Sequence, residues 1–331
     1  MEVEKRITWI DYTKGFAILL LLLSHSMTKY NLFNNWIFAF HMPIFFIICG
    51  YLVHLKYNDG FKDGQFFDLL SKRWYNIFIP YFIFGTILII FFTVLKLVSE
   101  TPSNAISMFI NLITMKGIAS MWFLPIYFFS EFLSISLLSL FKGKPMCYLM
   151  AFFVGVLWLV DQSTLSWPLD LLYKIAEGTV FIYIGTIFAN NELESKASVK
   201  IAVILLAISS FLTIFNQKAS MNNMGIVPLY FINATIISFS IITIIRQLGE
   251  RQGHYQLVSF YGKNSLIIVC TNNLVIEICR LIDHKMFCNS LLHMDYIGIF
   301  IFFIIITICE YPLLKLFEGK FKRPMTIIKR T

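Results

Sequence analysis

Long apolar blocks recur along the whole chain, and each is separated from the next by a short charged break. Of the 331 residues, 58% are hydrophobic and only 14% are charged, whereas soluble domains are about half apolar and about one quarter charged. A segment in lipid must satisfy its backbone hydrogen bonds internally, which favours helices. The sequence therefore predicts an all-α protein, built as a polytopic bundle of transmembrane helices.

Ten apolar segments are candidate spans: 8–28, 36–55, 74–98, 121–141, 147–160, 171–189, 200–215, 226–245, 264–282 and 296–316. With ten alternating spans, twenty of the 27 Lys and Arg residues fall on the side that holds both termini, and five fall on the other. This asymmetry predicts that both termini are cytoplasmic. We expect a multi-pass protein of the cell (plasma or inner) membrane, with one domain over residues 1–331. No loop is long enough for a soluble extracytoplasmic domain.

The remaining composition excludes several classes of function. A net charge of +8 occurs in nucleic-acid-binding proteins, but in a membrane protein it reflects basic cytoplasmic loops, so we expect no nucleic-acid partner. The six cysteines lack the paired spacing of a disulfide framework or a zinc site, and no metal site is indicated. No Walker loop, Rossmann glycine pattern, HExxH or GxSxG motif is present.

The first apolar segment carries three ionisable groups, Asp11, Lys14 and His25. Such groups are energetically unfavourable in lipid. On a helix, Lys14 and His25 lie within about 20° of one face and roughly 16 Å apart, with Asp11 about 60° from Lys14. These residues also have structural explanations. Asp11 and Lys14 can form a surface ion pair, and His25 can form a hydrogen bond between helices. Neutral imidazole is also suited to taking a proton from a hydroxyl.

Other polar groups lie in or beside later segments. His41 precedes Pro43, which cannot donate a backbone hydrogen bond and is expected to kink the helix. Arg73 stands just before a span and is also explained as a cytoplasmic anchor. Glu131, in the middle of a span, requires a partner or a water-filled cavity.

Two charge pairs at a spacing of three residues are expected to neutralise each other within the bundle. They are Lys174 with Glu177, and Glu277 with Arg280.

Five ordered motifs across most of the chain resemble the membrane acyltransferase 3 family. DYTKGFAILLLLLSH resembles the family's opening signature, an Asp before a basic residue and Gly, with ten residues between the basic residue and a His. The other motifs are FHMPIFFIICGYL, KRWYNIFIPY, MWFLPIYFFSEFL and YGKNSLIIVCTNN. In the first four motifs, the matching residues are Asp11, Lys14, Gly15, His25, His41, Pro43, Phe45, Gly50, Tyr51, Arg73, Pro80, Tyr81, Trp122, Phe123, Leu124 and Glu131.

The resemblance implies an integral-membrane O-acyltransferase, usually an O-acetyltransferase with acetyl-CoA as its cytoplasmic donor. The implied acceptors are hydroxyls of surface polysaccharides, peptidoglycan, lipid-linked sugars or small secreted products. The chain departs from the family at Cys49, where Ser is usual. It also has Thr271, Asn272 and Asn273 where a ninth-helix His is common.

The resemblance also implies roles for particular residues. His25 is expected to act as a general base on the acceptor hydroxyl, or to accept the acetyl group transiently. Asp11 would orient or balance Lys14, and Lys14 and Arg73 would bind the CoA phosphates. The residues expected to set the polarity of the cavity are His41, Glu131 and Trp122.

Two other classes fit the same pattern. A secondary transporter or flippase also combines about ten helices with buried ionisable groups, although no internal repeat is evident here. An inactive family member could act as a membrane partner. The acceptor, the acyl group and the oligomeric state stay open, a homo-oligomer among the alternatives.

Overall fold

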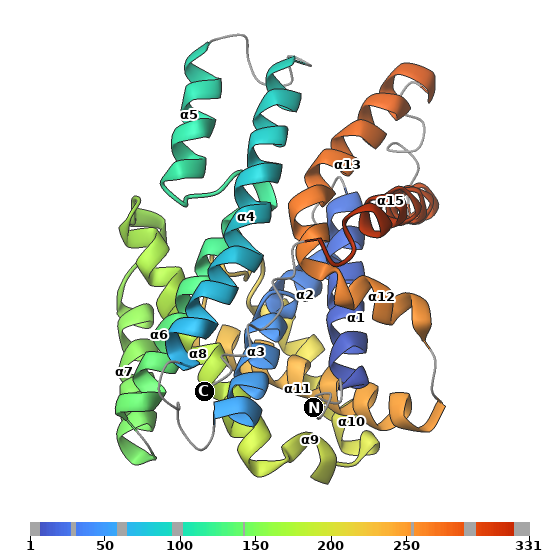
Figure 1. Ribbon diagram of the computed structural model, residues 1–331. Coiled ribbons are helices and arrows are strands. Elements are labelled where there is room, and N and C mark those ends of the chain that lie inside the picture. Colours follow the sequence, from blue (N-terminus) through green and yellow to red (C-terminus); the bar gives the residue numbers. More distant parts are fainter. Residues whose placement is uncertain are drawn as a thin grey trace, which may run out of the picture.

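The computed structural model describes residues 7–27, 31–57, 65–94, 102–141, 143–252, 255–287 and 296–320. Over these residues the regular secondary structure is helical, with one isolated antiparallel bridge between Ser220 and Asn223, which confirms the all-α prediction. The α-helices (Figure 1) are α1 (Thr8–Ser26), α2 (Leu32–Phe40), α3 (Pro43–Tyr57), α4 (Gln65–Val94), α5 (Pro102–Ile113), α6 (Phe123–Leu140), α7 (Lys144–Leu159), α8 (Leu169–Asn191), α9 (Leu193–Lys196), α10 (Val199–Leu212), α11 (Val227–Gln252), α12 (Gln256–Lys263), α13 (Ser265–Phe287) and α15 (Tyr296–Phe317). Short 3-10 turns are η1 (Ala119–Trp122), η2 (Gln162–Thr164) and η3 (Thr213–Phe215).

Seven helical segments among the described residues are long and apolar enough to cross a membrane: Leu32–Tyr57, Phe66–Val94, Ala119–Leu140, Leu169–Asn191, Val227–Gly249, Ser265–Met286 and Tyr296–Phe317. Three of the ten expected spans are not among them. The helices α7 and α10 have 16 and 14 residues, fewer than the roughly 20 that a span needs. The helix α1 has 19 residues, but its charged and imidazole side chains lower its hydropathy. The structure thus shows a multi-pass helical protein with fewer clear spans than expected.

The second predicted span is interrupted where the sequence suggested a kink. The helix α2 ends at Phe40, and α3 begins at Pro43. The His41 backbone N–H still donates to the carbonyl of Ile37, and the Phe45 N–H donates to Met42. Because proline supplies no N–H, the break falls where the helix can lose a hydrogen bond at least cost. It also places His41, which is buried, at the junction of the two helices.

The helix α1 packs against α11, α12, α13 and α15 (Figure 1). Its crossing with α12 is a direct contact between backbones. A Cβ on Gly15 would lie 2.0 Å from the carbonyl oxygen of Val258, and one on Gly262 would lie 1.8 Å from that of Asp11. The Lys-Gly and Gly-Lys-Asn-Ser motifs therefore hold two helices at a distance that only glycine permits.

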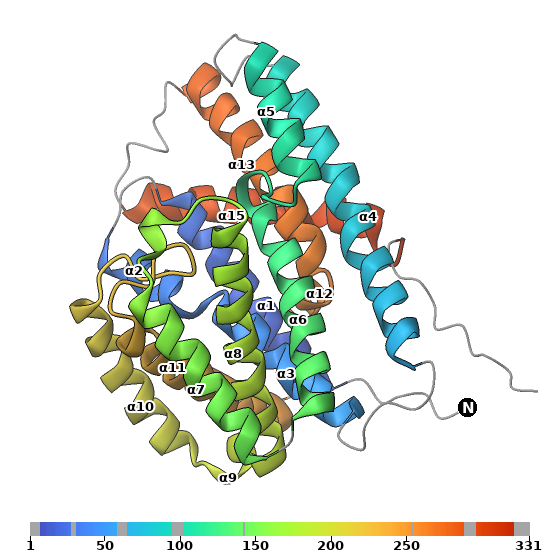
Figure 2. The same ribbon diagram turned by 90° about the vertical axis from the view of Figure 1, so that its left-hand side faces the viewer.

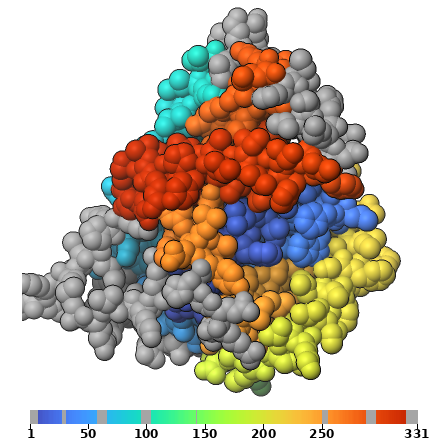
Figure 3. Space-filling model, turned by 90° about the vertical axis from the view of Figure 1, so that its right-hand side faces the viewer, coloured from blue at the N-terminus to red at the C-terminus, as the bar shows by residue number. Residues whose placement is uncertain are grey.

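A second close crossing joins α3 to α8. A Cβ on Gly50 would lie 1.8 Å from the carbonyl oxygen of Ile182, and one on Gly185 would lie 2.0 Å from that of Ile47. Small residues at helix interfaces are typical of membrane bundles, where close packing replaces the hydrophobic effect between helices. Figure 2 shows α8 beside α6 and α7 on this side of the molecule. On the opposite side, α15 lies across α13 and α1 at a steep angle (Figure 3).

Candidate active site

Two clusters of polar side chains lie along α1, one at Lys14 and one at His25. Both side chains are half-buried, and Asp11 is buried. Asp11 lies inside the bundle rather than at its surface, and its carboxylate is near enough to act on the charge of Lys14. The helix carries Lys14 and His25 on nearly one face, about 16 Å apart by helical rise.

The lysine cluster consists of Lys14, Cys49, Arg73, Tyr127 and Glu131, from α1, α3, α4 and α6. Arg73 Nη2 lies 2.7 Å from Glu131 Oε1, with the Glu131 side chain 4% exposed and that of Arg73 34% exposed. The Cys49 thiol and the Tyr127 hydroxyl lie close to each other in this cluster. The Lys14 ammonium is close enough to interact electrostatically with Arg73, Cys49 and Glu131. Four helices thus bring two cations and one carboxylate together inside the bundle.

The expected roles of Arg73 and Glu131 change in this arrangement. The partner that Glu131 requires is Arg73, and the second carboxylate oxygen, Oε2, is buried without a hydrogen-bond partner among the described residues. Because Glu131 balances the Arg73 charge, Arg73 is less available to a phosphate. Over the same residues, Lys14 forms no ion pair, although the carboxylates of Asp11 and Glu131 are near enough to act on its charge.

A groove between α4 and α6 reaches this ion pair from outside. Its walls are apolar, and Arg73 and Glu131 are the charged residues in its lining. The full lining is Phe66, Leu69, Leu70, Arg73, Phe128, Glu131, Phe132 and Ile135. A second, shallower depression continues along the same two helices beside Trp74 and Phe129.

The histidine cluster consists of His25, Phe38, His41 and Arg280. The Phe38 ring contacts both imidazoles, with centroid distances of 6.4 Å to His25 and 5.2 Å to His41. Arg280 Nη2 donates to the backbone carbonyl of His25 at 3.3 Å. In the described part of the chain, neither ring nitrogen of His25 has a hydrogen-bond partner. The imidazole is therefore positioned by packing and keeps both nitrogens available.

A backbone contact determines which ring nitrogen of neutral His41 carries the hydrogen. Its Nδ1 lies 2.9 Å from the carbonyl oxygen of Ile37. Since a carbonyl only accepts, Nδ1 carries the hydrogen and Nε2 carries the lone pair when the ring is neutral. The structure thus gives His41 a structural contact at the α2–α3 junction and leaves its Nε2 as an acceptor.

Trp122 belongs to neither cluster directly. The Lys174 ammonium lies 5.3 Å from the centroid of the Trp122 ring. Trp122 also contacts Phe123, whose ring packs on Tyr127 of the lysine cluster, with centroid distances of 6.3 Å and 5.5 Å. Trp122 therefore reaches the lysine cluster through aromatic packing rather than through a polar contact.

One of the two expected charge pairs is wrong. Lys174 binds Asp170 at 2.8 Å, one turn away on α8. Glu177 instead accepts a hydrogen bond of 2.9 Å from the hydroxyl of Tyr230 on α11. A carboxylate four residues away competes well with one three residues away, and Glu177 faces the interior. The pair of Glu277 and Arg280 is confirmed at 2.7 Å.

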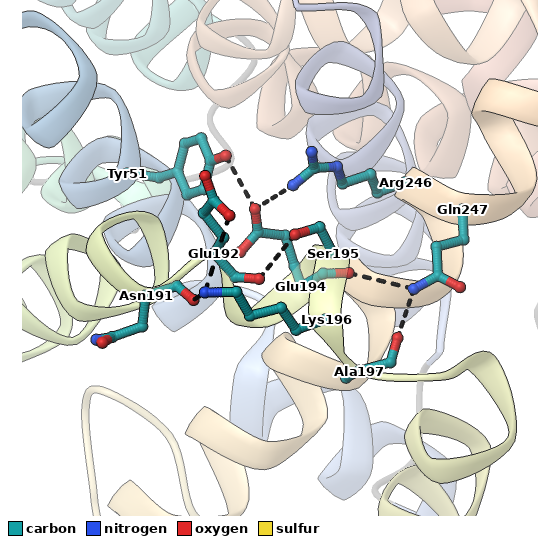
Figure 4. A network of polar contacts seen from close by, with 9 residues as sticks. All are labelled: Tyr51, Asn191, Glu192, Glu194, Ser195, Lys196, Ala197, Arg246 and Gln247. Atoms are coloured by element: carbon teal, nitrogen blue, oxygen red, sulfur yellow. Dashed lines mark hydrogen bonds and ion pairs between the residues drawn. The ribbon is translucent and has the colours of Figure 1, made fainter.

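A third polar network was not anticipated from the sequence (Figure 4). Glu194 on α9 is buried, accepts a hydrogen bond of 2.9 Å from the Tyr51 hydroxyl and forms an ion pair with Arg246 on α11. Arg246 also lies over the ring of Trp9, which contacts Tyr51. The network ties α1, α3, α9 and α11 together. Of these residues, the sequence analysis singled out Tyr51, in the Gly-Tyr-Leu motif. Glu194 lies in a short charged segment between apolar blocks, with nothing to distinguish it.

Fold and site together define a multi-pass membrane protein with ionisable groups of functional type inside the bundle. Comparison with known protein families identifies the family: a family model described as an acyltransferase domain matches residues 7–310. The chain therefore belongs to the membrane acyltransferase 3 family, and it is an acyltransferase-type membrane protein.

Similarity to a curated protein is partial. The chain is 30% identical over 95 residues to the inner membrane protein YcfT of Escherichia coli (strain K12). The match covers 23% of this chain and 26% of that protein.

Proposed function

We propose that this protein is a membrane O-acyltransferase that moves acetyl from cytoplasmic acetyl-CoA to a hydroxyl of a cell-surface or lipid-linked carbohydrate. It acts in the plasma (inner) membrane as one domain over residues 1–331. The seven apolar helical segments together with α1, α7 and α10 make ten spans, with both termini in the cytoplasm. Membrane lipid surrounds the bundle, nucleic acid has no part, and two copies can associate.

The observation that carries the proposal is the placement of Lys14 and His25 on one helix, in two separate polar clusters. The basic residue follows the start of α1, where the cytoplasmic face is expected. The imidazole stands in the last turn, near the opposite face. A donor from one side and an acceptor from the other can therefore meet along this helix.

The lysine cluster fits the phosphate groups of the donor. Lys14 offers a half-buried ammonium that forms no ion pair with another described residue, and such a group binds phosphate as a point charge. The pantetheine arm has about thirteen bonds between its phosphate and its sulfur, roughly 16 Å when extended. This length is close to the rise of about 16 Å between Lys14 and His25. Phosphate at Lys14 thus allows the thioester to reach His25.

Binding in this way requires side chains to move. Ile18 and Leu21 lie on the same face of α1 between the two groups, and both are fully buried. The arm has to displace the side chains that pack on them. Rearrangement on binding is common where a ligand enters a closed site.

His25 supplies the proton chemistry. Acetyl-CoA, when bound, contributes a thioester carbonyl and a thiolate leaving group. The neutral imidazole takes the proton of the acceptor hydroxyl as its oxygen attacks that carbonyl, and returns the proton to the leaving sulfur. Alternatively, an imidazole nitrogen takes the acetyl group first and passes it to the hydroxyl. His41 Nε2 and the cluster around it keep the neighbouring space polar.

The test is acetyl incorporation into surface glycans of cells that express His25→Ala at the normal protein level. We expect incorporation to fall by at least two orders of magnitude, the usual contribution of a general base. His54→Ala, on α3 and outside both clusters, is the matched control and should keep full activity. Undiminished acetylation in His25→Ala would remove this residue from the mechanism.

Mass spectrometry of surface glycans with and without the gene identifies the acceptor. The alternative classes predict other results with purified protein. A transporter or flippase would move substrate in proteoliposomes without acetyl-CoA, and an inactive partner would bind no acetyl-CoA.

A further inference from the structure

The ion pair of Glu277 and Arg280 adjoins the imidazole that the proposed reaction uses. Glu277 Oε1 and Arg280 Nη1 are 2.7 Å apart on α13, with 29% and 38% of the side chains exposed. The same guanidinium donates to the carbonyl of His25. Neither side chain is buried, and Arg280 connects Glu277 to the backbone of His25.

The exposure of this pair is unusual for its position. Residues 265–286 form one of the apolar segments able to cross a membrane. Charged groups facing lipid in such a segment are unfavourable and are normally found facing water or a polar cavity. Ile278, the next residue along from Glu277, is 39% exposed and suits lipid contact. The face of α13 that carries Glu277 and Arg280 is therefore expected to contact water or a polar cavity, and the face that carries Ile278 is expected to contact lipid.

Asn273 extends the polar face by one turn. Residues 273, 277 and 280 follow a spacing of four and three, which places them on one side of α13. The amide of Asn273 is half-buried and donates to Ser120 Oγ at 2.5 Å and to Asn272 Oδ1 at 2.9 Å. The Asn272 amide nitrogen is buried without a hydrogen-bond partner among the described residues. We call Asn273, Glu277 and Arg280 the α13 strip.

We propose that the α13 strip binds the carbohydrate acceptor and presents its hydroxyl to His25. This inference rests on the proposed function and adds an acceptor site to it. The Glu277 carboxylate and the Asn273 amide oxygen accept hydrogen bonds from sugar hydroxyls, and the Arg280 guanidinium donates to sugar oxygens. Because the charges of Glu277 and Arg280 cancel, the strip favours a neutral sugar over one that carries a carboxylate or a phosphate.

The first experiment measures whether water reaches the strip. The exposed Cys147 and Cys309, together with Cys288, which lies outside the described residues, are replaced by Ser, and Glu277→Cys or Ile278→Cys is added. Intact cells are treated with a membrane-impermeant maleimide, with the parent protein as background. We expect labelling of Glu277→Cys to be at least tenfold faster than that of Ile278→Cys, its lipid-facing neighbour. Equal rates, or no labelling of Glu277→Cys, overturn the proposal.

The second experiment measures binding without relying on catalysis. Asn273→Cys keeps the ion pair intact, and its labelling is followed with 4-nitrophenyl β-glucoside or the corresponding glucuronide. We expect the neutral glycoside to slow labelling at least threefold and the glucuronide to have a smaller effect. Adding Glu277→Gln leaves Arg280 without its carboxylate and should reverse this order, whereas Glu277→Asp should keep it. No protection, or equal protection by both probes, contradicts the proposal.

These results are separable from those on the proposed function. Full acetyl transfer in His25→Ala would refute the reaction mechanism without altering labelling of the strip. Conversely, an inaccessible strip would leave the His25 result unchanged and exclude this acceptor site.

Discussion

Arg73 and Glu131 form an ion pair of 2.7 Å between α4 and α6, with the carboxylate buried and the guanidinium half-exposed. The pair explains why a carboxylate is tolerated in the middle of α6, since a buried charge requires a partner. Because this pair balances the Arg73 charge, we assign anion binding to Lys14 in the proposed function. The two motifs that carry Arg73 and Glu131 therefore act as one unit.

Breaking this pair on one side should destabilise the protein. Arg73→Ala leaves the Glu131 carboxylate buried without its cation, and we expect a loss of about 2–3 kcal/mol, less than for a fully buried pair. The measurement is thermal unfolding of the purified protein in detergent. Replacing both residues, as Arg73→Met with Glu131→Leu, should restore most of the stability. A double variant as unstable as Arg73→Ala would argue against an uncompensated charge as the cause.

Gly262→Ala should disturb the crossing of α1 and α12. The added Cβ would lie 1.8 Å from the backbone oxygen of Asp11, which cannot rotate away as a side chain can. We expect a clearly lower unfolding temperature and reduced acetyl transfer, because α1 carries both Lys14 and His25. Gly155→Ala on α7 is the control, since nothing lies within 4 Å of its Cβ position. There the change should be neutral or stabilising by up to about 1 kcal/mol.

The sequence predicted the helical fold because lipid leaves few other structures, and it placed Lys14 and His25 on one face because helical periodicity is fixed. It predicted less well which helices meet. Arg73 forms an ion pair with Glu131, and Glu194 forms one with Arg246, and in each pair the two residues are far apart in the sequence. Such pairings depend on how helices are rotated and shifted against each other, which periodicity within one helix does not specify.

The number of spans shows a similar limit. Charge asymmetry predicted ten, whereas length and hydropathy identify seven among the described residues. The polar groups of α1 lower its mean hydropathy, so that it is not identified as a membrane-spanning helix. The residues to which we assign the reaction are thus those that lower the hydropathy of α1.

His41→Asn should separate a structural role from a catalytic one. The Asn amide can replace Nδ1 as the donor to Ile37, but it provides no counterpart to Nε2. Because we assign proton transfer to His25, we expect His41→Asn to keep activity within about tenfold, against at least about a hundredfold loss in His25→Asn. Acetyl transfer by purified protein, normalised to its amount, is the measurement. A loss in His41→Asn as large as that in His25→Asn would move the base to His41.

Tyr51→Phe should weaken the network in Figure 4 without changing either cluster on α1. The variant removes one hydrogen bond to the buried Glu194 carboxylate but keeps its ion pair with Arg246. A hydrogen bond to a charged group contributes about 1.5–3 kcal/mol. We expect a lower unfolding temperature and an unchanged KM for acetyl-CoA. Glu194→Ala should cost more, since it leaves Arg246 without this partner. A raised KM with unchanged stability would instead place Tyr51 in the donor site.

Lys14→Met should impair binding of the donor more than the chemical step. The substitution keeps most of the apolar stem and removes the ammonium that we assign to phosphate. We expect the KM for acetyl-CoA to rise at least about tenfold, equivalent to about 1.4 kcal/mol, with a smaller change in kcat. Lys14→Arg keeps the charge and should retain most of the affinity. If phosphate is the group recognised, acetyl-pantetheine, which lacks it, should be used equally well by the wild type and by Lys14→Met. A similar rise in KM for that shorter donor would show that Lys14 acts on the arm or the thioester instead.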